Sequence, residues 1–98
     1  MKHIDWDDLR LLLLIVQEGA LRSAARKAGL SPATLSRRLD DLEEALGQKV
    51  VERFQGGCVP TAFGADIVAR AGQMGEIALD IERSGDRQDA HAAAGIVR

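Results

Sequence analysis

Residues 20–44, ALRSAARKAGLSPATLSRRLDDLEE, constrain the fold more than any other part of this 98-residue chain. Leu21, Ala24, Ala25 and Ala28 recur at the spacing of the buried stripe of an amphipathic helix. Gly29 follows the stripe, where helices commonly end in a left-handed residue. The pattern predicts a short helix that ends in a tight turn, with small side chains that allow a second helix to cross closely.

A second helix is predicted directly after this turn. Ser31 suits its N-cap, and Pro32 suits its first position because the missing N–H is not needed there. Its apolar face comprises Leu35, Leu39, Leu42 and Leu46. Two such helices joined by a tight turn are typical of a helix-turn-helix, in which the second helix, here residues 32–46, enters the major groove of DNA.

The distribution of charge favours DNA as a partner, although the formal net charge is −2. Residues 21–39 carry five basic residues and no acidic one, whereas residues 1–20 sum to −2 and residues 40–98 to −5. The local field, rather than the total charge, governs contact with phosphate. The predicted phosphate contacts are Arg22, Arg26, Lys27, Ser31, Arg38 and Arg53.

The face of the second helix opposite its leucines is predicted to read bases. That face presents Pro32, Ala33, Ser36 and Arg37 in its first two turns. Ser36 is short enough for close approach, and Arg37 can donate two hydrogen bonds to a guanine. Ordinary helical bundles also contain such helix pairs, and arginines usually lie on solvated faces, so the motif alone leaves plain packing as an alternative.

With its flanks, this region resembles the N-terminal DNA-binding domain of the LysR-type transcriptional regulators, a bacterial family. The resemblance covers about two-thirds of the chain, from LRLLLLIVQEGALRSAARKAGLSPATLSRRLDDLEEALGQKVVER to VPTAFG. The matching residues are Ala24, Ala25, Leu30, Ser31, Leu35, Ser36, Arg37, Leu42, Glu43, Leu46, Gly47, Glu52, Arg53, Thr61 and Gly64. The resemblance implies a mainly α fold: a winged helix-turn-helix with a three-helix core and a two-stranded wing, followed by a long linker helix that pairs two chains.

The wing fits residues 50–52 as one strand, residues 55–57 as the turn and residues 58–59 as the return strand. Thr61 is then a plausible N-cap for the next helix. The family often has glutamine where Pro32 stands, and proline or serine where Ala33 stands, so base preference here is expected to differ. The wing often carries basic residues in the family, but Gly56, Gly57 and Val59 stand here.

Two apolar strips predict a dimer interface. The first follows the helix expected over residues 61–83, with a seam spaced alternately by four and three residues as in coiled coils. With its flanking residues it comprises Phe63, Ile67, Ala71, Met74, Ile77, Ala78 and Ile81. The second comprises Leu11, Leu14 and Ile15 on a helix expected over residues 5–18. The alternatives are a linker helix that covers only its own domain, and a first helix whose whole apolar surface faces the core.

The chain is thus expected to divide into a winged helix-turn-helix at 1–60, a dimerisation helix at 61–83, and, at 84–98, a flexible linker with the start of a missing effector-binding domain. A small-molecule effector is expected only for that missing domain. Cys58 is the single cysteine, which excludes an internal disulfide and fits a reducing cytoplasm; an inert apolar role is favoured over a redox sensor. The apolar run at 9–16 is too short to span a membrane.

No catalytic, cofactor or metal motif is recognised. Ser36 lies in no G-x-S-x-G turn, and His3 and His91 belong to no metal-spaced cluster. We therefore predict a sequence-specific DNA-binding domain of a LysR-type transcription factor, not an enzyme, that binds a two-fold-symmetric promoter site as a homodimer. Full-length members of the family often form tetramers. The alternative is a winged-helix interaction module with only nonspecific affinity for DNA.

Overall fold

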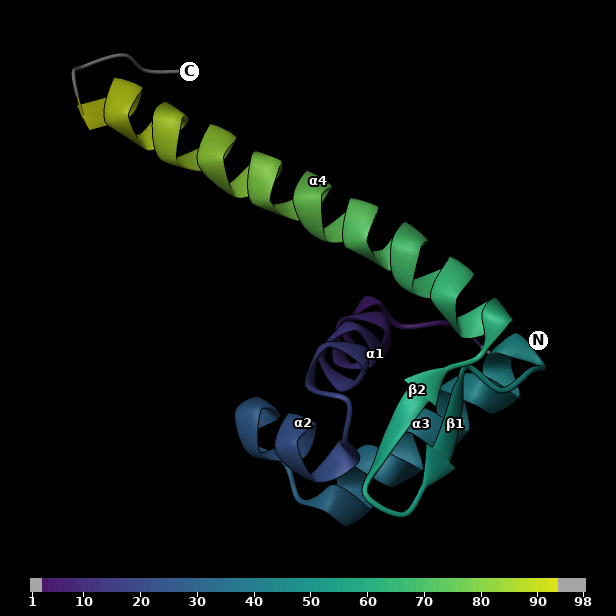
Figure 1. Cartoon of the computed structure of the whole chain (residues 1–98). Helices are drawn as coiled ribbons and strands as arrows, with labels where there is room; N and C mark the ends of the chain where they lie inside the picture. The colour runs from purple at the N-terminus through teal and green to yellow at the C-terminus, as the bar shows by residue number, and fades with distance from the viewer. Residues whose placement is uncertain (1–2, 94–98) are drawn as a thin grey trace.

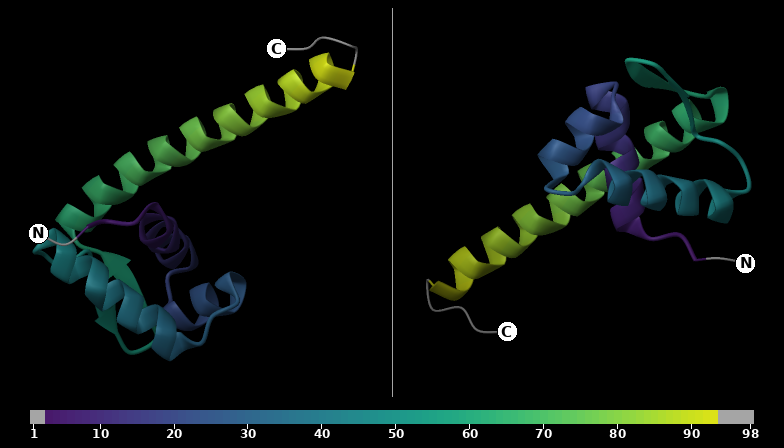
Figure 2. Two further views of the ribbon diagram at one scale, coloured as in Figure 1. Left: turned by 180° about the vertical axis from the view of Figure 1, so that it is seen from behind. Right: turned by 90° about the horizontal axis from the view of Figure 1, so that it is seen from below.

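The computed structural model describes residues 3–93, with side chains placed for residues 3–85. Its elements are α1 (Trp6–Glu18), α2 (Leu21–Ala28), α3 (Pro32–Leu46), β1 (Val51–Phe54), β2 (Gly57–Pro60) and α4 (Ala62–Ala93). The first three helices form a bundle, the strands form a hairpin beside it, and α4 extends beyond both as a long rod (Figures 1 and 2). The predicted fold class is confirmed.

The helix-turn-helix has the boundaries that its capping residues predict. Gly29 and Gly47 follow α2 and α3 with φ of 72° and 80°, in the left-handed region where glycine ends a helix at little cost. The Ser31 hydroxyl accepts a hydrogen bond from the Thr34 backbone N–H at 3.1 Å, so it caps α3. Pro32 occupies the first turn of α3 as predicted.

Helix α1 is the centre of the fold rather than one of its outer layers. It contacts α2, α3, α4 and β2, so apolar side chains are needed around most of its circumference. Leu11 and Ile15 are buried in the core of their own chain, and Leu14 is half-buried against that core. The prediction that these three residues form an outward strip for dimerisation is therefore wrong for Leu11 and Ile15.

One core joins the bundle to the wing. Its buried members are Leu11, Leu12, Ile15, Ala24, Ala25, Leu35, Leu39, Leu42, Val50, Val51 and Cys58. The Glu43 carboxylate supports this junction, because its Oε2 accepts hydrogen bonds from the backbone N–H groups of Val50 at 2.8 Å and Val51 at 3.3 Å. The end of α3 therefore fixes where the wing begins.

The wing is an antiparallel pair in which Val51 lies opposite Pro60 and Phe54 lies opposite Gly57. Its turn consists of Gln55 and Gly56, and Gly56 has a φ of 98°. Gly57, expected in the turn, instead opens β2. A two-residue connection is the commonest hairpin loop because it matches the twist of paired strands.

The wing is attached to the corner between α1 and α2. The Cys58 backbone N–H donates to the Gly19 carbonyl at 2.9 Å. A Cβ on Gly57 would lie 2.6 Å from the same carbonyl oxygen, so this approach requires glycine. The hairpin is thereby held against the bundle at its β2 strand.

Helix α4 begins as predicted but ends later. The Gly64 backbone N–H donates to the Thr61 hydroxyl at 2.9 Å, which confirms Thr61 as a capping residue. The helix continues to Ala93, whereas residues 84–94 were expected to be a linker. This segment has no proline and is rich in alanine, which has the highest helix propensity, so the helix continues through it. Residues 94–98, expected to open a further domain, lie outside the described residues.

Within the described part of the chain, no helix has the length and apolar character needed to cross a membrane.

Candidate nucleic-acid interface

The first two turns of α3 present an open face. Leu35, Leu39 and Leu42 turn inward, and the opposite side leaves Pro32, Ala33 and Arg37 exposed, with Ser36 half-buried. The structure therefore brings the four predicted base-reading residues together on one helix face. Because Pro32, Ala33 and Arg37 on this face are exposed, a DNA major groove could receive it.

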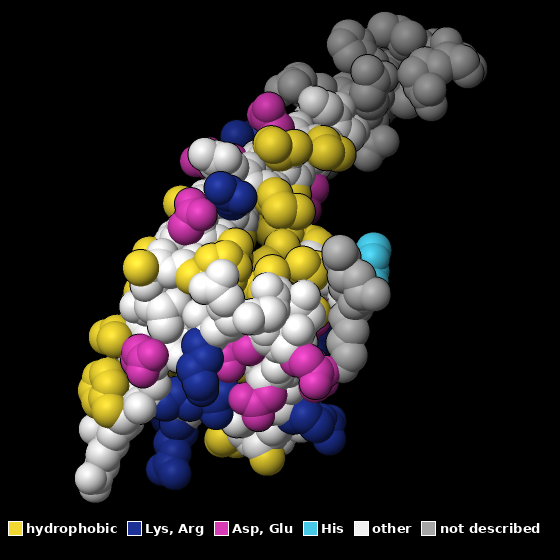
Figure 3. Space-filling view, turned by 90° about the vertical axis from the view of Figure 1, so that its right-hand side faces the viewer, with side chains coloured by type: hydrophobic (Ala, Val, Ile, Leu, Met, Phe, Trp, Pro, Cys, Tyr) yellow, Lys and Arg dark blue, Asp and Glu magenta, His cyan; other side chains and the backbone are white. Residues whose placement is uncertain are grey.

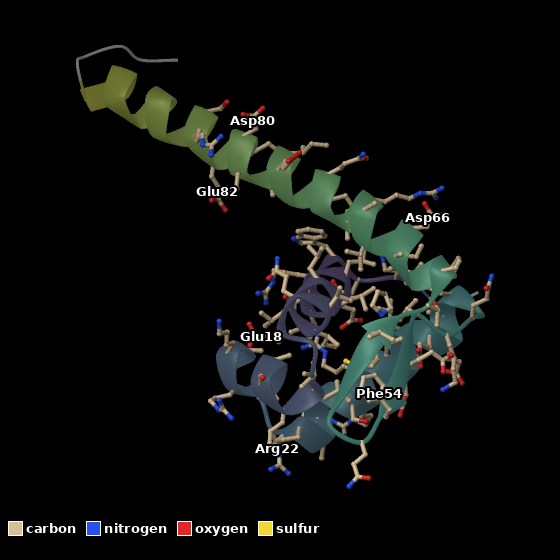
Figure 4. The ribbon with its side chains drawn as sticks, in the orientation of Figure 1. Glu18, Arg22, Phe54, Asp66, Asp80 and Glu82 are labelled. Carbon is tan, nitrogen blue, oxygen red and sulfur yellow. The ribbon has the colours of Figure 1, made fainter. Side chains whose placement is uncertain are left out.

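A cationic cleft lies next to this face, between the start of α2 and the wing. Its volume is about 530 Å³, and it is lined by Ala20, Leu21, Arg22, Ser23, Arg26, Arg53, Phe54, Gly56 and Gly57. Figure 4 shows Arg22 at the start of α2 and Phe54 on the neighbouring wing. Ala20 provides no side-chain cap for α2, so the first backbone N–H groups of this helix lack that acceptor.

The guanidinium groups of Arg22, Arg26 and Arg37 form no ion pair with any other residue that the structure describes. Lys27 differs, because its Nζ lies 3.1 Å from the Glu18 carboxylate on α1. That pair is exposed on the Lys27 side, so it contributes little to stability and competes weakly with another anion. Among the basic residues predicted to contact DNA, Arg22, Arg26 and Arg37 are thus the ones available to an external anion.

Arg38, predicted to contact phosphate, instead connects α3 to the start of α1. Its Nε and Nη2 donate to Asp8 Oδ1 at 3.0 and 2.7 Å, and Nη2 donates to Asp7 Oδ2 at 3.0 Å. The Arg38 side chain is 31% exposed and that of Asp8 is 22% exposed. Two carboxylates therefore neutralise this guanidinium before any DNA arrives.

The same cluster changes the acidity of its members. Hydrogen bonds from Arg10 and then from Arg38 lower the pKa of Asp7 below its ordinary value. The hydrogen bond to Asp8, followed by that to Asp7, raises the pKa of Arg38 further. Asp7 and Arg38 are accordingly charged at neutral pH.

Arg53, also predicted to contact phosphate, reaches from β1 to α3. Its Nη1 donates to Ser36 Oγ at 2.8 Å, and its Nη2 donates to Asp40 Oδ1 at 2.7 Å. One of the predicted base readers is therefore in direct contact with the wing.

The acidic partners were missed because nothing in the sequence marks them. Arg38 is separated from Asp7 and Asp8 by about thirty residues, and Arg53 from Asp40 by thirteen. No short-range spacing rule connects such pairs, unlike the helical pairs three or four residues apart.

The predicted dimerisation seam divides into two parts. Ala71 is buried, and Phe63 and Ile67 are half-buried, all packed within their own chain. Further along, an apolar groove of about 220 Å³ is lined by Trp6, Met74, Ile77, Ala78 and Ile81. Figure 3 shows hydrophobic side chains following α4, with basic side chains interspersed among acidic ones over the rest of this face.

This groove is the part of the seam that its own chain leaves uncovered. Ile81 is 66% exposed, and Met74 and Ile77 are also exposed. Figure 4 shows Asp66 and Asp80 on the side of α4 that faces away from the bundle. Ile77 lies at the edge of the groove, because it also lines a neighbouring pocket together with Asp80.

Cys58, the single cysteine of the chain, is buried in the core. Burial raises the pKa of the Cys58 thiol, against the opposing effect of the Arg53 charge, so the sulfur remains a thiol. Among the described residues, no three histidine, cysteine, aspartate or glutamate side chains are grouped to hold a metal ion.

Three helices, a two-stranded wing and an open second helix of the turn define a winged helix-turn-helix protein. Residues 6–65 match the family described as "Bacterial regulatory helix-turn-helix protein, lysR family". This match covers more than half of the chain, which therefore belongs to the LysR family of bacterial regulators.

Individual relatives agree with this assignment. The chain is 47% identical over 53 residues, 54% of its length, to a putative HTH-type transcriptional regulator, PtxE, of Stutzerimonas stutzeri, and covers 27% of that protein. A full-length OxyR variant from Pseudomonas aeruginosa superposes with a TM-score of 0.79 at 30% identity, covering 87% of this chain and 29% of the other. The chain spans about a fifth to a quarter of the length of the curated relatives it matches.

A smaller solved structure matches along its whole length. The CbnR DNA-binding domain, crystallised in a complex with DNA, superposes with a TM-score of 0.77 at 29% identity. The match covers 91% of this chain and 99% of the CbnR domain. The described fold, including α4, therefore corresponds to a domain that in CbnR has been crystallised with DNA.

Proposed function

We propose that this chain is a sequence-specific DNA-binding domain of a LysR-type transcriptional regulator. The observation that carries the proposal is the open start of α3 beside the guanidinium groups of Arg22, Arg26 and Arg37, which form no ion pair with the described residues. The starts of α2 and α3 and the wing turn lie together at the lower end of the molecule in Figure 1, away from α4. This end combines a helix that fits the major groove with cations on its flank.

Each group has a distinct role in this proposal. Pro32, Ala33, Ser36 and Arg37 face the base edges. Arg22, Arg26, Lys27 and Ser31 bind phosphates, assisted by the uncapped N–H groups at the start of α2. Arg38 holds α3 in place, because its charge is already shared with two carboxylates.

We further propose that two copies pair through the groove between Trp6 and the exposed seam of α4. A second copy suits this groove because its lining is entirely apolar and continues a seam with coiled-coil spacing. A symmetric pair would present two α3 helices, and hence would bind a site with two-fold symmetry. Two linked domains also bind a two-part site more tightly than one domain alone.

Selection from random genomic DNA fragments at near-physiological salt tests the proposal. We expect enrichment of a two-fold-symmetric motif. Arg37→Ala should weaken binding to that motif by ~1–3 kcal/mol and relax one position of it. Arg70→Ala is the matched control: it is also an exposed helical arginine, but on α4 beside Asp66, and it should leave the motif unchanged.

Retention of DNA without a motif, abolished by a modest rise in salt, would contradict sequence-specific binding. The domain would then be a winged-helix interaction module with only nonspecific affinity for DNA.

A further inference from the structure

Arg53 forms a bridge between the wing and the proposed reading face. It contacts two residues one turn apart on α3, Ser36 and Asp40, at 2.8 and 2.7 Å. Arg53 is 32% exposed, while Asp40 is 62% exposed. The carboxylate therefore holds one guanidinium nitrogen, and the other nitrogen is left directed at the Ser36 oxygen.

The direction of the hydrogen bond at Ser36 is fixed by chemistry. A guanidinium has only donors, whereas a serine hydroxyl has one donor hydrogen and two acceptor lone pairs. Ser36 Oγ must therefore be the acceptor in this contact. Its hydroxyl hydrogen then points elsewhere, and its oxygen is held in one position instead of rotating among three staggered orientations.

A phosphate-binding role suits Arg53 poorly in this arrangement. Its charge is already paired with Asp40, and an acid at this place repels a DNA backbone. Releasing the guanidinium for a phosphate would break both of its contacts to α3. The Asp40 carboxylate is thus better explained as the group that positions Arg53 than as a chance surface charge.

Resting on the proposed function, we propose that Arg53, positioned by Asp40, sets the base preference of Ser36 by presenting its hydroxyl as a hydrogen-bond donor. A donor at this point favours bases with an acceptor on the major-groove edge: guanine, adenine through N7, and thymine through O4. Cytosine, which offers an amino donor there, is disfavoured because it would have to use the single lone pair of Ser36 that Arg53 leaves free. Arg53 is thus a positioning residue whose effect is confined to one base pair.

The test compares motifs and affinities for a set of variants. The motif selected by the wild-type protein is determined first, and the position altered by Ser36→Ala is identified. Affinities are then measured for four duplexes that differ only at that position. In wild type, we expect the cytosine duplex to bind about fivefold more weakly than the best one, which corresponds to about one hydrogen bond.

Arg53→Ala and Asp40→Ala should each remove most of that fivefold preference at the same position, with the rest of the motif intact. The double variant Ser36→Ala with Arg53→Ala should lose no more discrimination than either single variant. Arg22→Ala is the control for a phosphate contact, and it should weaken all four duplexes equally. Thermal melting identifies any loss of fold in Arg53→Ala, and the more exposed Asp40→Ala keeps the test valid in that case.

The proposal would be overturned if Arg53→Ala weakened binding to all four duplexes equally and Asp40→Ala strengthened binding to all four equally. Those results are expected if Arg53 binds a phosphate and Asp40 reduces its availability. A Ser36→Ala variant with an unaltered motif would overturn it as well. If the wild-type protein selects no motif, sequence-specific binding itself fails, and the role of Arg53 fails with it.

Discussion

Arg38→Ala should destabilise the fold rather than remove a DNA contact. The substitution removes three hydrogen bonds to Asp7 and Asp8 and leaves Asp8 without its guanidinium partner. Asp7 retains Arg10, at 2.7 Å. The main loss is therefore the partly covered contact with Asp8, which joins the middle of α3 to the first turn of α1.

The size of the effect follows from the burial of that contact. Hydrogen bonds to charged groups contribute about 1.5–3 kcal/mol when covered, and exposed ion pairs about 0–1 kcal/mol. Arg38 and Asp8 are 31% and 22% exposed, between these cases, so we expect a loss of about 1.5 kcal/mol. For a domain of this size, that corresponds to a melting temperature lower by roughly 6–12 °C.

Thermal unfolding at a fixed protein concentration measures the change, and a double-mutant cycle with Asp8→Asn isolates the pair. We expect a coupling free energy of about 1 kcal/mol in the cycle. Arg10→Ala is the matched control, because its pair with Asp7 is exposed and lies within one helix, and it should cost less than about 0.5 kcal/mol. An unchanged melting temperature, with a salt slope of DNA binding reduced by about one, would refute this reasoning and make Arg38 a phosphate ligand.

Three further predictions concern pH, pairing and packing. Because the folded-state pKa of Asp7 is lowered, its contribution to stability is complete above the unfolded pKa of 3.8 and is lost as the pH falls through the folded pKa. Acid unfolding curves should show this loss of stability, and the loss should be smaller in Arg38→Ala. Ile77→Asp should give monomers in analytical ultracentrifugation and should also weaken DNA binding, whereas Leu79→Asp, outside the apolar groove, should leave the dimer intact. A dimeric Ile77→Asp variant would show that the groove is not the interface. Gly64→Ala should prevent stable folding because its Cβ would overlap the Val50 carbonyl, whereas Gly72→Ala, with open space around it, should stabilise α4 by about 1 kcal/mol. Equal melting temperatures of the two variants, measured by circular dichroism, would contradict this packing.

Much of the local structure could be predicted because its causes are local. The caps at Ser31 and Thr61 and the helix ends at Gly29 and Gly47 depend on residues within one turn, and each is found where its residue type predicts. The exposed face of α3 follows from the spacing of its leucines in the same way. The end of α4 differs from the prediction, because residues 84–93 lack an apolar stripe, which is typical of a linker, but continue the helix.

The candidate site could be predicted only in part. Arg22, Arg26 and Arg37 are exposed, as their predicted contacts with DNA require. This prediction depends on no contact with a distant part of the chain. Arg38 and Arg53 are also arginines that were predicted to contact phosphate, but carboxylates engage both of them. Whether an arginine is available to DNA depends on which acids the fold brings within reach.

The helix-turn-helix, its caps, the hairpin and the family could be predicted from the sequence alone, because spacing and capping act over a few residues. Which apolar residues remain exposed after the chain has folded depends on how the helices pack. Leu11 and Ile15 match an outward strip in the sequence, but α1 is covered on several sides, so they belong to the core. The tertiary structure also decided that Arg38 holds α3 to α1 and that Arg53 bonds Ser36, since ion pairs between distant segments exist only after the core has set the distance between helices.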